Sequence, residues 1–304
     1  MTTGTPAPTG HVVCGVDGSD FAQHAVDWAA DEAVLRGTDL ELVHAWEPKA
    51  FARHDWYAGL LHDAGVEVLQ RHAAHARHRR PGLRVTTDIV RADAADVLEA
   101  ASARAGLLVV GRRGLGGFTG MLLGSVSRKL AGLTHCPLLV VPADAHGATG
   151  GTGADEGTPR SAKPVIVGVS DATCAPAVEW AFQEAALRNL PLRVWHTWAF
   201  PPTPAPDSIS PPSARAAFAE AQRDGEAMLA RVVAPFRAAY PDVEATEEVV
   251  NRPAVGALID FSDGAALTVV ATHRRPHDYG RTIGRVTYAA LHHAHSAVLL
   301  IPVP

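Results

Sequence analysis

The chain has 304 residues and a net charge of −5, with 47% hydrophobic and 19% charged residues. It is long enough for two medium domains, and it lacks the basic charge that nucleic acids or membrane surfaces attract, so we expect neither partner. Its apolar runs are too short to cross a membrane, and the start MTTGTPAPTG has neither the basic nor the hydrophobic part of a signal peptide. These features predict a cytoplasmic protein.

The three cysteines, Cys14, Cys136 and Cys174, lie far apart and show no Cys-x-x-Cys spacing. The sequence therefore indicates neither a disulfide framework nor a zinc site. We expect reduced, mostly buried thiols.

In the first half of the chain, short apolar runs alternate with longer helical patterns. The runs predict strands at 11–16, 40–46, 84–90, 107–111 and 138–142. The helical patterns predict a helix capped by Ser19 and stopped by Gly37, and further helices at 57–79, 94–104 and 125–133. Five strands that alternate with four helices imply a parallel sheet covered on both faces, because parallel neighbours need crossover connections.

The second half repeats the first. WAADEAVLRG (28–37) returns as WAFQEAALRN (180–189), LELVHAW (40–46) as LRVWHTW (192–198), and HCPLLVVP (135–142) as HSAVLLIP (295–302). The same patterns predict strands at 164–169, 192–198, 243–250, 266–271 and 297–302, and helices at 175–188, 213–239, 254–262 and 285–293. A period of about 150 residues is the size of a whole domain.

We therefore predict an α/β protein with two tandem domains, at 11–143 and 163–304, each a five-stranded parallel sheet flanked by helices. A tail (1–10) and a linker (144–162) rich in Gly, Ala and Thr are predicted to be flexible. Strands 138–142 and 297–302 are apolar edges, and such edges favour either a homodimer or pairing of the two domains within one chain.

A glycine-rich run, GRRGLGGFTGMLLGS (111–125), follows the fourth strand. It is not a Walker loop, because Gly117 stands where lysine is required, and it is not a dinucleotide fingerprint, which would follow the first strand. Glycines at a strand end allow close approach of a planar or anionic ligand. The helix start at Gly124-Ser125 offers N–H groups to a phosphate, and the hydroxyls of Ser125 and Ser127 could add donors, although Ser127 could equally be a solvated position.

At the end of the first strand, Asp17 could take a metal ion, a ribose hydroxyl or a backbone donor. It could also serve only as a turn residue before Gly18-Ser19.

The spacing Gly-x2-Gly-x9-Gly-Ser, the GVDGS segment (15–19) and the strand ending in His44-Ala45 resemble the ATP-binding branch of the universal stress protein family. The resemblance covers both halves and implies Rossmann-like, adenine nucleotide alpha hydrolase-like domains that bind ATP, often with Mg2+ or Mn2+. It implies that Asp17 and Ala45 contact adenosine, and Asp17 could also contact a divalent ion bound to the nucleotide. The Arg113 guanidinium could pair with phosphate. The implied nucleotide-binding positions are Gly15, Asp17, Ala45, Val110, Gly111, Arg113, Gly114, Gly124, Ser125 and Val126.

The second half departs from this pattern. Ala271 replaces the first glycine, Arg274 the second, and Arg285 the serine after Gly284, while Ser170 replaces the aspartate. We therefore expect one working nucleotide site and one structural half, although the arginines there could attract an anion.

Repeated aromatic and imidazole side chains have simpler interpretations. Tryptophans recur in register in the two halves and predict core or domain packing: Trp28, Trp180, Trp46 and Trp198. Histidines recur near helix 57–79 and near the C-terminus, and we interpret them as polar faces and not as metal sites: His72, His75, His78, His292, His293 and His295.

The leading functional hypothesis is a non-enzymatic ATP-binding stress protein, in which ATP orders the loop 112–123 and biases a partner or dimer surface. One alternative is a slow metal-dependent ATPase or phosphotransferase that uses Asp17. Others are an AMP or cyclic AMP sensor and a nucleotide-free scaffold.

Overall fold

A computed structural model describes residues 10–47, 55–114, 123–142, 163–199, 212–273 and 283–303. The predicted linker, almost all of the predicted tail and most of the loop 112–123 lie outside these residues. The first half contains the elements β1 (Val12–Gly15), α1 (Asp20–Leu35), β2 (Leu40–Ala45), α2 (Asp55–Arg79), β3 (Val85–Val90), α3 (Ala94–Ser102), β4 (Leu107–Gly111), α4 (Ser125–Leu130) and β5 (Leu138–Val141).

The second half repeats this order with one added 3-10 turn. Its elements are β6 (Val165–Val169), η1 (Ala172–Cys174), α5 (Ala175–Arg188), β7 (Leu192–Trp198), α6 (Pro212–Ala239), β8 (Ala245–Asn251), α7 (Ala254–Asp263), β9 (Leu267–His273), α8 (Arg285–His293) and β10 (Ala297–Val303). Every predicted strand and helix is present. The largest error is at α4, which ends at Leu130 and not at residue 133.

Local signals explain the helix ends. The Ser19 hydroxyl caps α1 by accepting a hydrogen bond from the Ala22 N–H at 3.3 Å. Gly37 takes a left-handed φ of 62° after α1, and Asn189 takes a φ of 52° at the matching end of α5. Glycine and asparagine tolerate this conformation better than other residues, which is why both copies of the repeat turn sharply here into the next strand.

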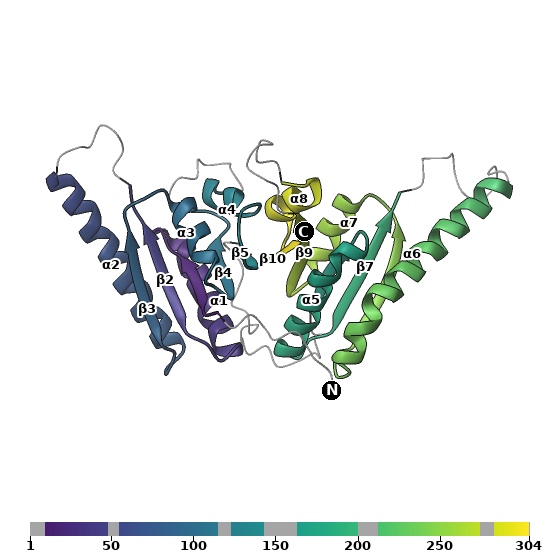
Figure 1. Ribbon diagram of the computed structural model, residues 1–304, viewed down its shortest axis with the longest axis horizontal. Helices are drawn as coiled ribbons and strands as arrows, with labels where there is room; N and C mark the ends of the chain where they lie inside the picture. The colour runs from purple at the N-terminus through teal and green to yellow at the C-terminus, as the bar shows by residue number, and fades with distance from the viewer. Residues whose placement is uncertain are drawn as a thin grey trace, which may run out of the picture.

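The strands of both halves form one ten-stranded sheet in the order β3-β2-β1-β4-β5-β10-β9-β6-β7-β8 (Figure 1). Pairing within each half is parallel, as predicted. β5 and β10 pair antiparallel at the centre, with Val140 opposite Val298 and Leu138 opposite Leu300. The two apolar strands predicted as edges thus cover each other, and the two halves pair within one chain.

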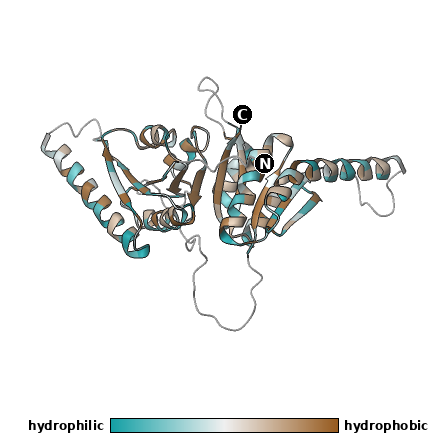
Figure 2. Ribbon diagram, turned by 60° about the horizontal axis from the view of Figure 1, so that its bottom comes forward, coloured by the Kyte–Doolittle hydropathy of each residue, from teal (hydrophilic) through white to brown (hydrophobic). Residues whose placement is uncertain are grey.

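Side chains alternate between the two faces of the sheet, and each face has its own core. Val12 and Cys14 belong to the core that α1, α2, α5 and α6 cover, whereas Val13 belongs to the core that α3, α4, α7 and α8 cover. Each core runs through both halves. Figure 2 shows the strands mainly hydrophobic and the long outer helices hydrophilic on much of their surface.

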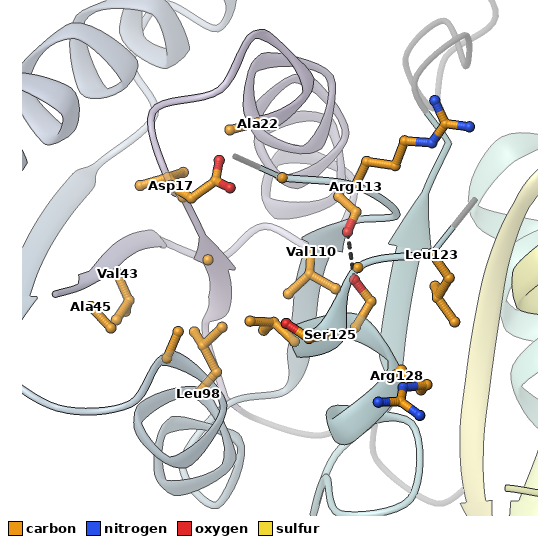
Figure 3. Close-up of a pocket in the computed structure, with 18 of the residues that line it drawn as sticks. Asp17, Ala22, Val43, Ala45, Leu98, Val110, Arg113, Leu123, Ser125 and Arg128 are labelled. Carbon is orange, nitrogen blue, oxygen red and sulfur yellow. Dashed lines mark hydrogen bonds between the residues drawn. The ribbon is translucent and has the colours of Figure 1, made fainter. Parts of the chain in front are cut away.

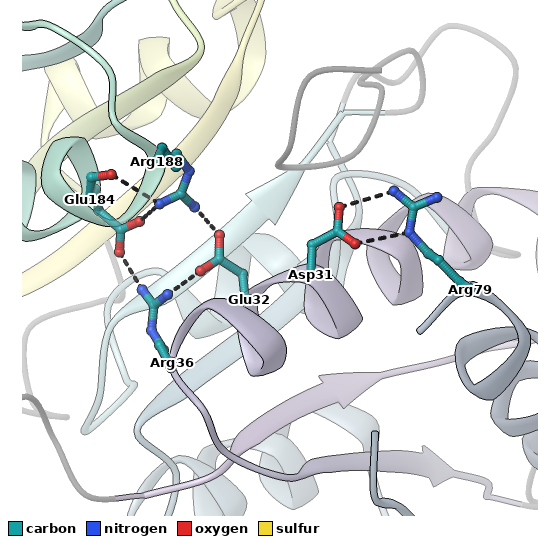
Figure 4. Close-up of polar contacts among 6 residues, drawn as sticks. All are labelled: Asp31, Glu32, Arg36, Arg79, Glu184 and Arg188. Atoms are coloured by element: carbon teal, nitrogen blue, oxygen red, sulfur yellow. Dashed lines mark hydrogen bonds and ion pairs between the residues drawn. The ribbon is translucent and has the colours of Figure 1, made fainter. Parts of the chain in front are cut away.

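A buried ion cluster joins α1 to α5 on one face of the sheet (Figure 4). Arg36 pairs with both Glu32 and Glu184, and Arg188 pairs with the same two carboxylates. The side chains of both glutamates are 1% exposed and that of Arg188 is 3% exposed. Because the four residues occupy matching positions in the repeat, the cluster is nearly symmetric and links the two halves.

The predicted packing in the core or at the junction is confirmed for Trp28 and Trp180, whereas Trp46 and Trp198 are half-buried and belong to neither core. Trp28 is buried in the core, and the Arg36 guanidinium lies 5.6 Å from the ring centre of Trp180 at the junction of the halves. The Arg91 guanidinium lies over Trp46 at 5.4 Å, and the Trp198 Nε1–H donates to the Gln222 amide oxygen at 3.0 Å.

The interpretation of the α2 histidines as one polar face is wrong for His72. This side chain is 3% exposed because α2 packs against α1. His75 lies in the same contact, with its Nε2 2.6 Å from an Asp27 carboxylate oxygen, and only His78 is exposed. All three cysteines are buried and free, as predicted. None of the helices in the described ranges is long and apolar enough to span a membrane.

Candidate functional site

The carboxyl ends of β1, β2 and β4 and the start of α4 surround a cavity of about 500 Å³ (Figure 3). It lies where the winding of the first half reverses, between β1 and β4, which is the usual ligand position in doubly wound sheets. All the binding positions expected from the sequence line this one cavity: Gly15, Asp17, Ala45, Val110, Gly111, Arg113, Gly114, Gly124, Ser125 and Val126.

Asp17 is held at the end of β1 by the residue two positions later. Its Oδ1 accepts hydrogen bonds from the Ser19 N–H at 3.0 Å and from the Ser19 hydroxyl at 2.7 Å. Asp17 is therefore a turn residue through its Oδ1, and it also lines the cavity.

Gly114 approaches this carboxylate so closely that no side chain fits. A Cβ atom built on Gly114 would lie 2.0 Å from Oδ2 of Asp17. A Cβ on Gly111 would lie 3.0 Å from the Arg113 carbonyl oxygen. Glycine at both positions therefore lets the chain after β4 fold back over the end of β1. Gly15 has a different role, because a Cβ there would lie 2.7 Å from Leu98 of α3, which packs against the strand.

The chain returns from the loop to β4 through two hydrogen bonds. The Gly124 N–H donates to the Arg112 carbonyl at 2.8 Å, and the Ser127 hydroxyl donates to the Gly111 carbonyl at 2.8 Å. Ser127 is buried, so its interpretation as a solvated position is wrong, and its proton is already donated within the protein. Ser125 is exposed at the first position of α4, where the N-cap residue Gly124 offers no side-chain cap.

Two arginines lie at this end of the cavity. Arg113 lines it, and its Nε is buried without a hydrogen-bond partner among the described residues. Arg128 of α4 is exposed and also lines it. In the view of Figure 3, Arg128 and Asp17 lie on opposite sides of the cavity. Cationic side chains and helix-start N–H groups together favour an anion.

The opposite end of the cavity is lined by small and apolar side chains, Val43 and Ala45 of β2. β2 is held to β1 beyond their paired residues, because Nδ1 of His44 lies 2.8 Å from the Val16 carbonyl oxygen. His196 and Val169 repeat this 2.8 Å contact in the second half.

Sequence reasoning missed several lining residues. Arg128 had a usable signal, since it lies one helical turn beyond Ser125. Tyr288 and His292 had none, because they belong to α8 of the second half. The remaining ones are apolar or small residues of neighbouring elements: Val16, Ala22, Val43, Ala94, Leu98 and Leu123.

The second half contains a matching cavity of about 420 Å³ with a different lining. Trp195 takes the strand position that Val43 has in the first half, and its side chain is buried at 3% exposure. Its ring reaches the end of β6, since a Cβ on Gly168 would lie 2.8 Å from it. Ala271 and Arg285 also line this cavity, whereas Arg274 lies outside the described residues.

The first cavity offers few carboxylates for metal binding. Asp17 is the sole carboxylate among its described lining residues. No group of three or more His, Cys, Asp or Glu side chains within the described ranges could hold a metal ion. A divalent ion here would take most of its oxygen ligands from a bound molecule.

Comparison with known proteins places this architecture in a family. The family model described as "Universal stress protein family" matches the chain twice, at residues 8–142 and 161–302. A universal stress protein of Mycolicibacterium smegmatis is 29% identical over 302 residues, which cover 95% of this chain and 96% of the relative. A universal stress protein of Mycobacterium tuberculosis is 32% identical over 288 residues, or 90% of each chain.

A solved structure supports the fold. A universal stress protein of Archaeoglobus fulgidus aligns with a TM-score of 0.65 at 12% identity and covers 97% of this chain and 99% of its own. Two matches to the family model in tandem and full-length relatives lead to one conclusion: the chain belongs to the universal stress protein family.

Proposed function

We propose that this protein binds ATP in the cavity of its first half and acts in the cytoplasm as a non-enzymatic, nucleotide-dependent regulator of a stress response. The observation that carries the proposal is that all ten positions expected to bind the nucleotide line one cavity. Its volume of about 500 Å³ lies within the range of about 300–1,000 Å³ that small-molecule sites occupy.

The two ends of the cavity suit the two ends of the nucleotide. Ala45 and Val43 leave room for a flat apolar group, which adenine supplies. The start of α4 and the arginines Arg113 and Arg128 suit the phosphates, because N–H groups and guanidinium groups both bind phosphate oxygens. Asp17, on the opposite side, is placed to accept a hydrogen bond from a ribose hydroxyl or to contact a phosphate-bound Mg2+ or Mn2+ ion.

The lining supports ligand storage and not ligand turnover. Phosphoryl transfer needs an oriented nucleophile in addition to positive charge. Asp17 is the one carboxylate among the described lining residues, and Ser19 already holds its Oδ1. ATP occupancy, and the release of ATP, would then be the signal.

We propose one nucleotide per chain. In the second cavity, Trp195 occupies space beside the end of β6 where the first half has Val43, and Arg285 replaces Ser125 at the helix start. Both changes replace small groups with large ones at positions that a nucleotide would approach.

The test is calorimetric titration of the purified chain with ATP, AMP and cyclic AMP. ATP should bind with one site per chain, and Gly114→Val should abolish binding because its side chain would overlap Asp17. Gly264→Val is the matched control, since a Cβ at Gly264 meets nothing within 4 Å and this residue ends α7 in the other half. Both variants should keep the far-UV circular dichroism of the wild type.

Other outcomes select other functions. Tighter binding of AMP or cyclic AMP than of ATP would indicate a sensor of those nucleotides. ATP turnover that disappears in Asp17→Ala would indicate an enzyme. Flat titrations with all three nucleotides, and no nucleotide released on denaturation, would leave only a scaffold.

A further inference from the structure

We propose that the second half supplies part of the ligand site of the first half, through His292 of α8, which contacts the anionic part of the ligand. This inference rests on the proposed function, since it names a further binding residue of the same cavity. According to this inference, the ligand site is complete only when α8 of the second half lies beside the first half.

The geometry brings α8 to the first cavity. The antiparallel pair β5·β10 places α8 beside α4, and the Arg112 guanidinium donates to the Ala294 carbonyl at 2.9 Å. The Thr272 hydroxyl crosses the junction in the other direction and donates to the Ala131 carbonyl at 3.2 Å. Tyr288 and His292, one turn apart on the same face of α8, line the cavity as a result.

The His292 ring is fixed but incompletely bonded. It stacks on Tyr288 with ring centres 4.1 Å apart and an interplanar angle of 26°. Its Nε2 is buried and has no hydrogen-bond partner within the described part of the chain. A buried polar atom without a partner costs folding free energy, so Nε2 would gain a hydrogen bond if ligand binding turned the ring and brought it to an anionic oxygen. The earlier interpretation of His292 as part of an exposed polar face is therefore wrong, because the side chain is half-buried.

The charges around His292 favour an anion as that ligand group. Burial, followed by the nearby His293, Arg112 and Arg128, lowers the pKa of His292. An anionic group bound among these cations would offset their repulsion and favour the protonated imidazole. ATP binding should therefore take up a proton at His292 and strengthen as the pH falls from 8 toward 6.

The test compares His292→Ala with His293→Ala in the full chain. His293 is the matched control, because it is the next residue of α8, is exposed and lies outside the first cavity. Titrations use ATP and adenosine at pH 6 and pH 8. Loss of one hydrogen bond to a charged group should weaken ATP binding by about tenfold or more at pH 6 and flatten its pH dependence. Adenosine affinity should stay at the wild-type value in both variants, and His293→Ala should change ATP affinity less than His292→Ala does.

Several results would overturn the inference. Equal ATP affinities of His292→Ala and His293→Ala, while Gly114→Val loses binding, would refute it and leave the proposed function standing. An equal loss of ATP and adenosine would show that His292 only shapes the cavity. If wild type binds no adenine nucleotide, both proposals fail. Should His292→Ala not fold, His292→Gln replaces it. The glutamine amide keeps a neutral hydrogen-bond donor, so ATP binding should persist while the pH dependence of ATP binding disappears. An unchanged pH dependence would refute the inference.

Discussion

Glu184→Ala is expected to destabilise the protein strongly, because it breaks the buried ion cluster at the junction of the halves. Glu184 and Glu32 are each 1% exposed, and together they balance Arg36 and Arg188. Removing one carboxylate leaves two guanidinium groups with one partner, and Arg188 is itself 3% exposed (Figure 4). Breaking a buried ion pair in this way typically costs about 3–5 kcal/mol, out of a total stability of about 5–15 kcal/mol.

Urea denaturation followed by tryptophan fluorescence would measure this loss. Glu247→Ala is the control, since the Arg237–Glu247 pair has side chains 48% and 26% exposed and should contribute about 0–1 kcal/mol. The double variant Glu184→Ala/Arg188→Ala should be less destabilised than the sum of the single variants, because it also removes one of the unpaired charges. A loss of less than about 1 kcal/mol for Glu184→Ala, similar to the control, would refute the reasoning.

Three further predictions concern titrating side chains. Burial, together with the charges of Arg71 and His75, lowers the pKa of His72. The unfolding free energy of the wild type should therefore fall as the pH drops below about 6.5. His72→Leu should lose this part of the pH dependence in urea titrations at pH 7.5 and 5.5. Hydrogen bonds from Thr173 lower the pKa of Asp171. Asp171→Ala should therefore cost about 1 kcal/mol at pH 7, and the cost should shrink as the pH falls below about 4 and wild type loses the interaction in turn. Burial raises the pKa of the Cys136 thiol to about 12, and all three thiols are buried. They should therefore resist Ellman's reagent at pH 8 until guanidinium chloride unfolds the chain. Rapid labelling of the native protein would contradict the burial.

The order of strands and helices was predictable because each element has a strong local signal. Apolar strands, helical periodicity and residues such as Ser19 and Gly37 act within a few positions of the chain. The function of the glycine run in close packing was equally predictable from the sequence, since Gly114 has to lack a side chain beside Asp17. Its position at a strand end then fixed where the cavity would form.

The junction of the halves was not predictable in the same way. The repeated segments WAADEAVLRG and WAFQEAALRN contain Glu32, Arg36, Glu184 and Arg188, but nothing in either copy indicates that the four would meet. Their contact depends on the antiparallel pairing of β5 with β10, which brings α1 and α5 together. The same long-range pairing places His292 at the first cavity, so a reading of one half alone misses it.

The near-twofold pairing of the halves also explains how two copies of one pattern form two different cavities. When the halves are matched through Gly124 and Gly284, the position of His292 corresponds to Gly132, which has no side chain. Tyr288 corresponds to Arg128, which lines the first cavity. Among the described residues, the second cavity receives no side chain from α4, whereas the first receives two from α8. The first cavity is a composite of both halves.

A composite cavity makes ligand binding a property of the junction. A ligand held only by the first half would stabilise that half and leave its pairing with the second unchanged. A ligand that also contacts α8 binds more tightly while the halves are paired, so the free energy of that additional contact adds to the stability of the pair. Tandem duplication would thus let occupancy of one cavity stabilise the pairing of both halves.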